Sequence, residues 1–100
     1  MSVRGMIMRE RTEEALAAAV RDALAELPRA TWATVDEIAA SVPGLECRVD
    51  GTYEVVALGA TVTADDVRDA AIGVMNHADE LGLHVSFDRA RGFSVFDLAS

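Results

Sequence analysis

The sequence predicts an α+β fold with three helices and two β-hairpins in a single domain. Three stretches carry apolar residues at helical spacing, two others alternate apolar and polar residues as strands do, and threonine capping motifs precede two of the helices. A chain of 100 residues is long enough for one hydrophobic core and too short for two. We expect residues 1–8 to form a flexible N-terminal arm and residues 9–100 to form the domain.

The first helix is predicted at about residues 10–27. Leu16, Val20 and Leu24 recur at four-residue spacing, while charged residues occupy other faces. Thr12, which two glutamates follow, suits the helix start, and a start nearer Met8 is the alternative. Pro28 ends the helix, because the residue before a proline is disfavoured in the helical region.

The second helix is predicted at about residues 34–42. Thr34 and Glu37 have the spacing of a capping box, in which each side chain accepts a hydrogen bond from the other residue's backbone N–H. Pro43 and Gly44 end this helix. Trp32 lies in the extended link before it, where an indole either covers the core or anchors a partner.

A hairpin is predicted at about residues 45–59. Leu45, Cys47 and Val49 alternate with charged residues, and Asp50-Gly51 follows. Asp-Gly between two such runs is a strong hairpin signal, and as a two-residue turn it requires positive φ at both central residues. The alternation places Cys47 on the inward side as a small core residue.

The third helix is predicted at about residues 64–81. Thr63 is its cap with Asp66 at the third helical position, and Gly82 follows its last residue. Ile72 lies away from the apolar stripe, so it either packs under the inserted hairpin or is an exposed contact residue. The stripe consists of Val67, Ala70, Ala71, Val74, Met75, Ala78 and Leu81.

A second hairpin is predicted at about residues 83–98, with a basic tip that contains Arg89 and Arg91. Near its end Phe96 and Leu98 change face relative to the preceding apolar residues. That change predicts either a β-bulge or a final strand that is buried on both sides.

This order of elements resembles the winged helix-turn-helix domain. The matching stretches are ATWATVDEIAASVPGL, TADDVRDAAIGVMNHADELGL and HVSFDRARGFSVFDL, the last as the wing. The resemblance implies that helix 64–81 occupies the position that reads DNA, with residues 46–61 as an insertion. The competing arrangement joins both hairpins in a four-stranded antiparallel sheet that the helices cover on one face.

The charge distribution argues against binding to nucleic acid. The net charge is −8, all nine basic residues are arginine as in proteins from GC-rich genomes, and residues 31–100 carry the whole excess of acid. Such a field repels phosphate and favours basic partners. The single cysteine fits a reducing, cytoplasmic location, and the N-terminus has no long apolar run, which predicts neither a signal peptide nor a membrane span.

No arrangement of residues indicates catalysis. His77 and His84 do not form a recognised metal-ligand pattern, and the sequence has no glycine-rich phosphate loop, Cys-x-x-Cys or Gly-x-Ser-x-Gly motif. We therefore expect a protein that is not an enzyme and that needs no metal or cofactor.

The leading functional prediction is a small acidic protein-interaction domain, an adaptor or a nucleic-acid-mimicking inhibitor. Its partner would be another protein with a basic surface, and self-association into a homodimer is a further alternative. Its contact residues would be Asp65, Asp66, Asp69, Ile72, Asn76 and Glu80. The alternative is a DNA-binding winged-helix transcriptional regulator, whose contacts would be Arg68, Arg89 and Arg91.

Overall fold

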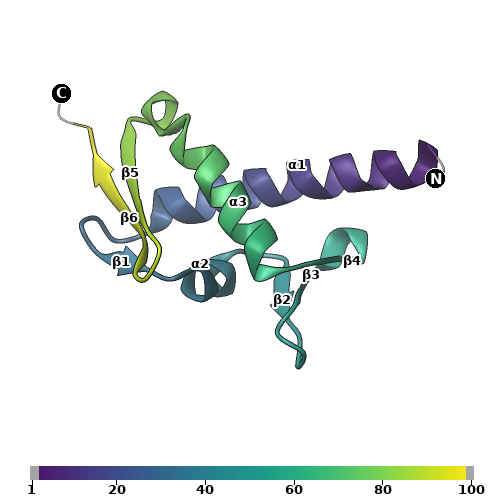
Figure 1. Cartoon of the computed structure of the whole chain (residues 1–100). Coiled ribbons are helices and arrows are strands. Elements are labelled where there is room, and N and C mark those ends of the chain that lie inside the picture. The colour runs from purple at the N-terminus through teal and green to yellow at the C-terminus, as the bar shows by residue number, and fades with distance from the viewer. Residues whose placement is uncertain (1–2, 99–100) are drawn as a thin grey trace.

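The computed structural model describes residues 3–98, with side chains from residue 9 onward. The described chain has helices of several lengths and two antiparallel three-stranded sheets, which confirms the α+β class (Figure 1). The elements in order are α1 (Val3–Glu26), β1 (Trp32–Ala33), α2 (Val35–Ser41), β2 (Leu45–Cys47), β3 (Tyr53–Val55), the 3₁₀ turn η1 (Val56–Leu58), β4 (Ala60–Val62), α3 (Ala64–Met75), the 3₁₀ turn η2 (Ala78–Leu81), β5 (Leu83–Asp88) and β6 (Gly92–Asp97).

The first sheet has the strand order β1-β6-β5. The predicted hairpin at 83–98 is present, and its register runs without interruption from Leu83 opposite Asp97 to Asp88 opposite Gly92. The expected bulge is therefore absent from this hairpin. Phe96 and Leu98 are 40% and 46% exposed, so the end of the strand is not buried on both sides either.

The second sheet has the order β2-β3-β4 and shares no strand with the first, so the four-stranded alternative is wrong. The predicted hairpin at 45–59 is present only as β2 and β3. The apolar run that follows forms η1 instead of continuing the strand, and Gly59 at φ +63° leads into β4, a strand that the sequence did not indicate.

The turn between β2 and β3 differs from the predicted two-residue type. The N–H of Arg48 donates to the carbonyl of Thr52, and the N–H of Gly51 donates to the carbonyl of Arg48. Gly51 has φ +87° while Asp50 is not among the residues with positive φ, so the loop has three residues with glycine in the left-handed position. Cys47 is exposed, and its predicted place in the core is wrong. Leu45, on the same face of β2, packs against the core, but the burial of this face does not extend to Cys47 at the end of the strand.

The core lies where α1, α2 and α3 pack against the first sheet. The backbone of α1 is helical from Val3, so the predicted arm at residues 3–8 belongs to this helix and Thr12 lies inside it; residues 1 and 2 are outside the described chain. The N-terminal end of α1 projects beyond the remaining elements (Figure 1). The largest fully buried side chains are Phe93, Leu24, Ile38, Val20, Val67 and Val95.

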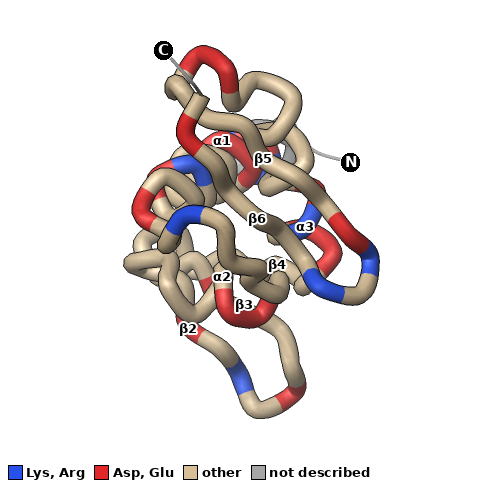
Figure 2. Tube along the Cα trace, turned by 90° about the vertical axis from the view of Figure 1, so that its left-hand side faces the viewer, with Lys and Arg blue, Asp and Glu red and all other residues tan. Residues whose placement is uncertain are grey.

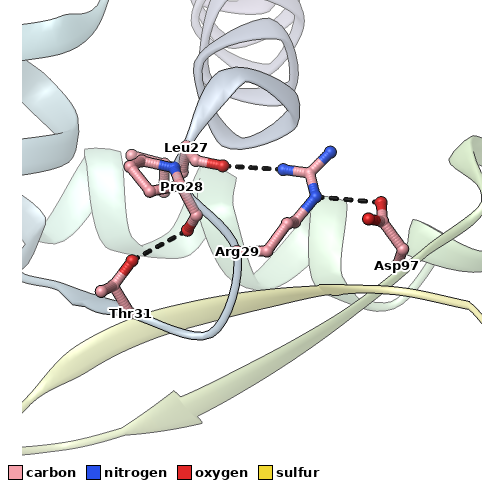
Figure 3. Close-up of polar contacts among 5 residues, drawn as sticks. All are labelled: Leu27, Pro28, Arg29, Thr31 and Asp97. Carbon is pink, nitrogen blue, oxygen red and sulfur yellow. Dashed lines mark hydrogen bonds and ion pairs between the residues drawn. The ribbon is translucent and has the colours of Figure 1, made fainter.

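The α1–β1 link is held by side-chain hydrogen bonds (Figure 3). Arg29 donates from Nε to Oδ1 of Asp97 at 2.9 Å and from a terminal nitrogen to the carbonyl of Leu27 at 2.8 Å. The hydroxyl of Thr31 donates to the carbonyl of Pro28 at 2.9 Å. The two bonds of Arg29 tie the end of α1 to the last residue of β6, and the bond of Thr31 stabilises the link itself.

Candidate interaction surface

The start of α3 is fixed by a capping box. The hydroxyl of Thr63 accepts a hydrogen bond from the N–H of Asp66 at 3.2 Å, and a carboxylate oxygen of Asp66 accepts one from the N–H of Thr63 at 2.8 Å. Asp65 and Asp66 occupy the first turn, where the positive end of the helix dipole favours carboxylates. The predicted cap and helix start are confirmed.

The exposed side chains of Asp65, Asp66 and Asp69 form what we call the acidic face of α3. Arg68 lies among them, with its guanidinium 3.4 Å from Oδ1 of Asp65 and 3.6 Å from Oδ1 of Asp69. One guanidinium therefore balances one of three carboxylates, and the face presents net negative charge to solvent.

The predicted helix at 64–81 ends at Met75, which separates Glu80 from the acidic face. The N–H of Asn76 still bonds the carbonyl of Ile72, but His77 has φ −125° and the chain continues as η2 on a new axis. Asn76 is an exposed C-cap, and Glu80 lies in η2 with a carboxylate oxygen 4.0 Å from Nδ1 of His77. The continuous stripe is also broken, because Leu81 is 40% exposed.

Ile72 is partly buried and packs against the core cluster. Only part of its side chain is available to a partner. The structure thus brings Asp65, Asp66 and Asp69 together. Of the other predicted contact residues, Ile72 lies at the margin of this face, Asn76 at the end of α3 and Glu80 in η2.

The arginines of the β5–β6 tip have different surroundings. The guanidinium of Arg91 lies 4.3 Å from the ring centroid of Trp32 and 3.4 Å from Oδ2 of Asp88. The N–H groups of Arg91 and Ala90 both donate to Oδ1 of Asp88, and these bonds hold the pKa of that carboxyl below its usual value. Arg91 is therefore engaged within the domain, although no sequence signal linked it to Trp32.

Arg89 is exposed and makes no ion pair within residues 3–98. It borders a shallow hollow between the tip, the start of α2 and the start of α3, and basic and acidic segments meet there (Figure 2). Two arginines and two aspartates face this hollow: Arg68, Arg89, Asp36 and Asp65. Opposite charges are matched in number, so the hollow is not a basic site.

Tyr53 attaches the second sheet to α2. Its ring is buried, and its hydroxyl donates a hydrogen bond of 2.5 Å to Oδ1 of Asp36. The hydrogen bond to Asp36, with burial as the second cause, raises the pKa of Tyr53 to about 12. The hydroxyl therefore stays protonated at neutral pH and acts as a structural donor.

A second surface feature is a groove where α3 crosses α1. It is lined by apolar and small side chains, together with five acidic residues and two arginines. Gly73 lies in the middle of α3 at this groove, and a Cβ added there would meet no atom within 4 Å. The residues around it include Glu13, Glu14, Leu16, Ala17, Ala18, Arg21, Asp66, Asp69, Gly73, Val74, Glu80 and Leu81.

Three further observations bear on function. Among residues 3–98, no group of three or more histidine, cysteine, aspartate or glutamate side chains could hold a metal ion. No helix in the described part of the chain has the length and apolar character needed to cross a membrane. Comparison of the chain with family models, with curated proteins and with solved structures finds no match.

Proposed function

We propose that this chain is a non-enzymatic, cytoplasmic protein-interaction domain that binds a protein with a basic surface through the acidic face of α3. In its most specific form, the domain is an adaptor or inhibitor that occupies a groove of its partner protein, where that partner otherwise binds nucleic acid. The observation that carries this proposal is the exposure of Asp65, Asp66 and Asp69 around a single arginine that they already neutralise. Carboxylates in this arrangement attract basic side chains and repel phosphate.

The order of elements supports the choice of α3 as the contact element. In the winged-helix resemblance, the helix at 64–81 occupies the position that reads DNA. Here β1 pairs with β6, and α2 and α3 precede the β5–β6 hairpin. If the chain has this architecture, α3 is the helix that faces a partner, and its exposed residues select against DNA.

DNA binding is the second candidate, and the exposed Arg89 at the β5–β6 tip is the observation in its favour. Arg68 is engaged by Asp65 and Asp69, and Arg91 by Asp88. Breaking these ion pairs would lower the gain from each phosphate contact. A mobility shift of duplex DNA at low salt, lost steeply as salt rises, would support this candidate against the proposed function.

The proposed function is tested by comparing two double variants. One reverses two charges on the acidic face, and the other reverses two charges elsewhere on the surface. Asp65→Lys with Asp69→Lys should abolish the recovery of partner proteins from a lysate of the source cell. Asp66 is left unchanged because its carboxylate caps Thr63. The control, Glu26→Lys with Glu46→Lys, changes exposed residues and raises the net charge from −8 by the same four units.

Retained recovery with the first pair, or equal loss with both pairs, would contradict the proposed surface. Circular dichroism of all variants confirms that the helices remain folded. A partner recovered only by the native chain and the control would then be identified and tested for a basic contact surface.

A further inference from the structure

The groove at the crossing of α1 and α3 is long enough to receive a helix. Its lining on α1 runs from Arg9 to Arg21, which at about 1.5 Å per residue spans roughly 18 Å. Its lining on α3 runs from Asp66 to His77 and uses positions 66, 69, 70, 73, 74 and 77. Spacings of three and four residues follow one face of a helix, so each of the two helices contributes one face to the groove.

Much of the lining is small or apolar. Ala17 and Ala70 are partly buried, and Ala18 is exposed. The side chain of Leu81 is 40% exposed at the same groove. Small side chains at a helix surface let another helix pack closely against it. A helix that lies in a groove by its apolar face is a recurring mode of recognition between proteins.

Gly73 indicates that an incoming element approaches the backbone of α3. Glycine inside a helix costs about 0.5–1 kcal/mol relative to alanine. The φ of Gly73 is not positive, and an added Cβ would contact nothing within 4 Å, so the domain itself does not require glycine there. Residues that depart from local propensity without a gain for the fold are expected at functional sites. Close approach of a second backbone is the gain that glycine provides.

The charge of the groove selects a basic occupant. Five carboxylates and two guanidiniums line it, and all five acidic residues are exposed. One of the two arginines, Arg21, also lies 3.5 Å from the carboxylate of Asp22. Lysine and arginine side chains complement such a surface, whereas acidic segments and phosphates are repelled. The charged lining residues are Glu13, Glu14, Asp66, Asp69 and Glu80 with Arg9 and Arg21.

We propose that the α1–α3 groove binds a basic amphipathic helix of the partner protein. The apolar face of that helix packs against Ala18, Gly73 and Leu81, and its basic residues face the surrounding carboxylates. This inference rests on the proposed function and makes it more specific, because Asp66 and Asp69 belong both to the groove and to the acidic face of α3. Asp65 does not line the groove and remains open to the partner's surface beside that helix.

Fluorescence anisotropy of a labelled model peptide tests the groove with purified components. The probe is a peptide of about 18 residues, blocked at both ends, with leucine at every third or fourth position and lysine and alanine elsewhere. The full chain should bind this peptide with a dissociation constant of about 10 µM, which rises with salt concentration. A peptide of the same composition, with the leucines spread around the helix, should bind at least about tenfold more weakly because it has no apolar face.

Three arginine substitutions separate binding in the groove from general attraction to an acidic protein. Gly73→Arg and Ala18→Arg each place a long cationic side chain at the groove, so each should raise the dissociation constant of the peptide about tenfold. Ala40→Arg is the control with the same change of charge, because Ala40 is exposed on α2 and outside the groove. It should bind the peptide within about twofold of the native chain. Circular dichroism confirms that all three variants are folded.

Gly73→Ala tests the close approach of the helix. The added methyl group should raise the dissociation constant of the peptide about threefold, because it separates the two backbones. The same substitution should increase the stability of the free domain, since alanine favours the helix. A purely structural role of Gly73 would not give weaker binding together with greater stability. An unchanged dissociation constant would contradict the close approach.

The proposal is overturned if the native chain does not bind the model peptide at about 1 mM, the weak limit of specific association. It is also overturned if Gly73→Arg and Ala18→Arg bind the peptide as the native chain does. Sedimentation velocity of the chain alone tests the other occupant: self-association that Gly73→Arg abolishes would place a second copy in the groove and contradict the proposal. Failure of the proposed function is seen separately, as recovery from the lysate that survives Asp65→Lys with Asp69→Lys, because the peptide titration contains no lysate protein.

Discussion

The guanidinium of Arg91 lies 4.3 Å from the centroid of the Trp32 ring, so the tip of one hairpin covers the strand that follows α1. These residues are far apart in sequence, yet β1 and β6 are adjacent strands and bring them together. Of the two sequence alternatives for Trp32, a cover over the domain fits its partly buried position. The guanidinium covers one face of the ring.

Replacing Arg91 should therefore affect both stability and the environment of the indole. Arg91→Ala should lower the free energy of unfolding by about 1 kcal/mol, because a cation–π contact and an exposed ion pair are lost. Trp32 is the single tryptophan, so its fluorescence reports the change directly. Arg89→Ala removes the same charge from the same tip and should leave both quantities near their native values; equal effects would contradict a specific role of Arg91.

The hydrogen bond from Tyr53 to Asp36 predicts a pH dependence at alkaline pH. The pKa of Tyr53 is raised to about 12 in the folded protein, from an ordinary value near 10. The resulting stability is fully present below pH of about 10 and is lost as pH rises through about 12, because the unfolded chain then ionises more readily. Tyr53 is the single tyrosine, so its absorbance titration measures this pKa without interference.

Tyr53→Phe should lower the free energy of unfolding by about 1 kcal/mol at neutral pH. The cost is modest because Asp36 is exposed and water can replace the lost donor. Asp36→Asn retains an acceptor without the charge, and it should move the tyrosine titration back towards the ordinary value. A titration that is unchanged in Asp36→Asn would show that the carboxylate is not the cause.

Gly92 should not tolerate any side chain. It has φ +96°, and an added Cβ would lie 2.0 Å from the backbone carbonyl oxygen of Ala33. Gly92→Ala should cost about 3 kcal/mol or more, since strain in the backbone adds to a clash with β1 that no side-chain movement can relieve. Gly51→Ala is the control: Gly51 has φ +87° with open space around it, and its cost should be about 1–2 kcal/mol. Urea unfolding of both variants measures the difference.

Replacing Gly73 should change the free energy of unfolding in the opposite direction. It lies within α3, its φ is not positive, and a Cβ there would contact nothing within 4 Å. Gly73→Ala should raise the free energy of unfolding by about 0.5–1 kcal/mol, because alanine loses less backbone entropy in a helix. A thermal melt that shows destabilisation would mean that the backbone of α3 differs at this position.

The sequence predicted the helix starts at Thr34 and Thr63 correctly because a capping box is a local interaction. Each box joins residues three positions apart, and both are present with the expected hydrogen bonds. The β5–β6 hairpin was equally predictable from the sequence, since alternation and a short tip are also local features. The three exposed aspartates of the acidic face follow from the same helical spacing.

The errors arise where tertiary contacts outweigh local pattern. No glycine or proline marks the break after Met75, and apolar spacing continues through Ala78, so the sequence indicated one helix up to residue 81. Cys47 alternates correctly for a strand, but alternation cannot tell how far along a strand the core covers the inward face. Thr12 with Glu13 and Glu14 resembles a helix start although the helix begins at Val3.

The two sheets differ in how far apart in the sequence their paired residues lie. The second sheet pairs residues 45–62 only with one another, whereas the first joins Trp32 to Ser94. Loop-closure entropy makes long-range pairing slow relative to local pairing. During synthesis the β2-β3-β4 sheet and α3 emerge before β6 does. The β1–β6 ladder, and with it the cover of Arg91 over Trp32, must therefore form after these local elements have become available.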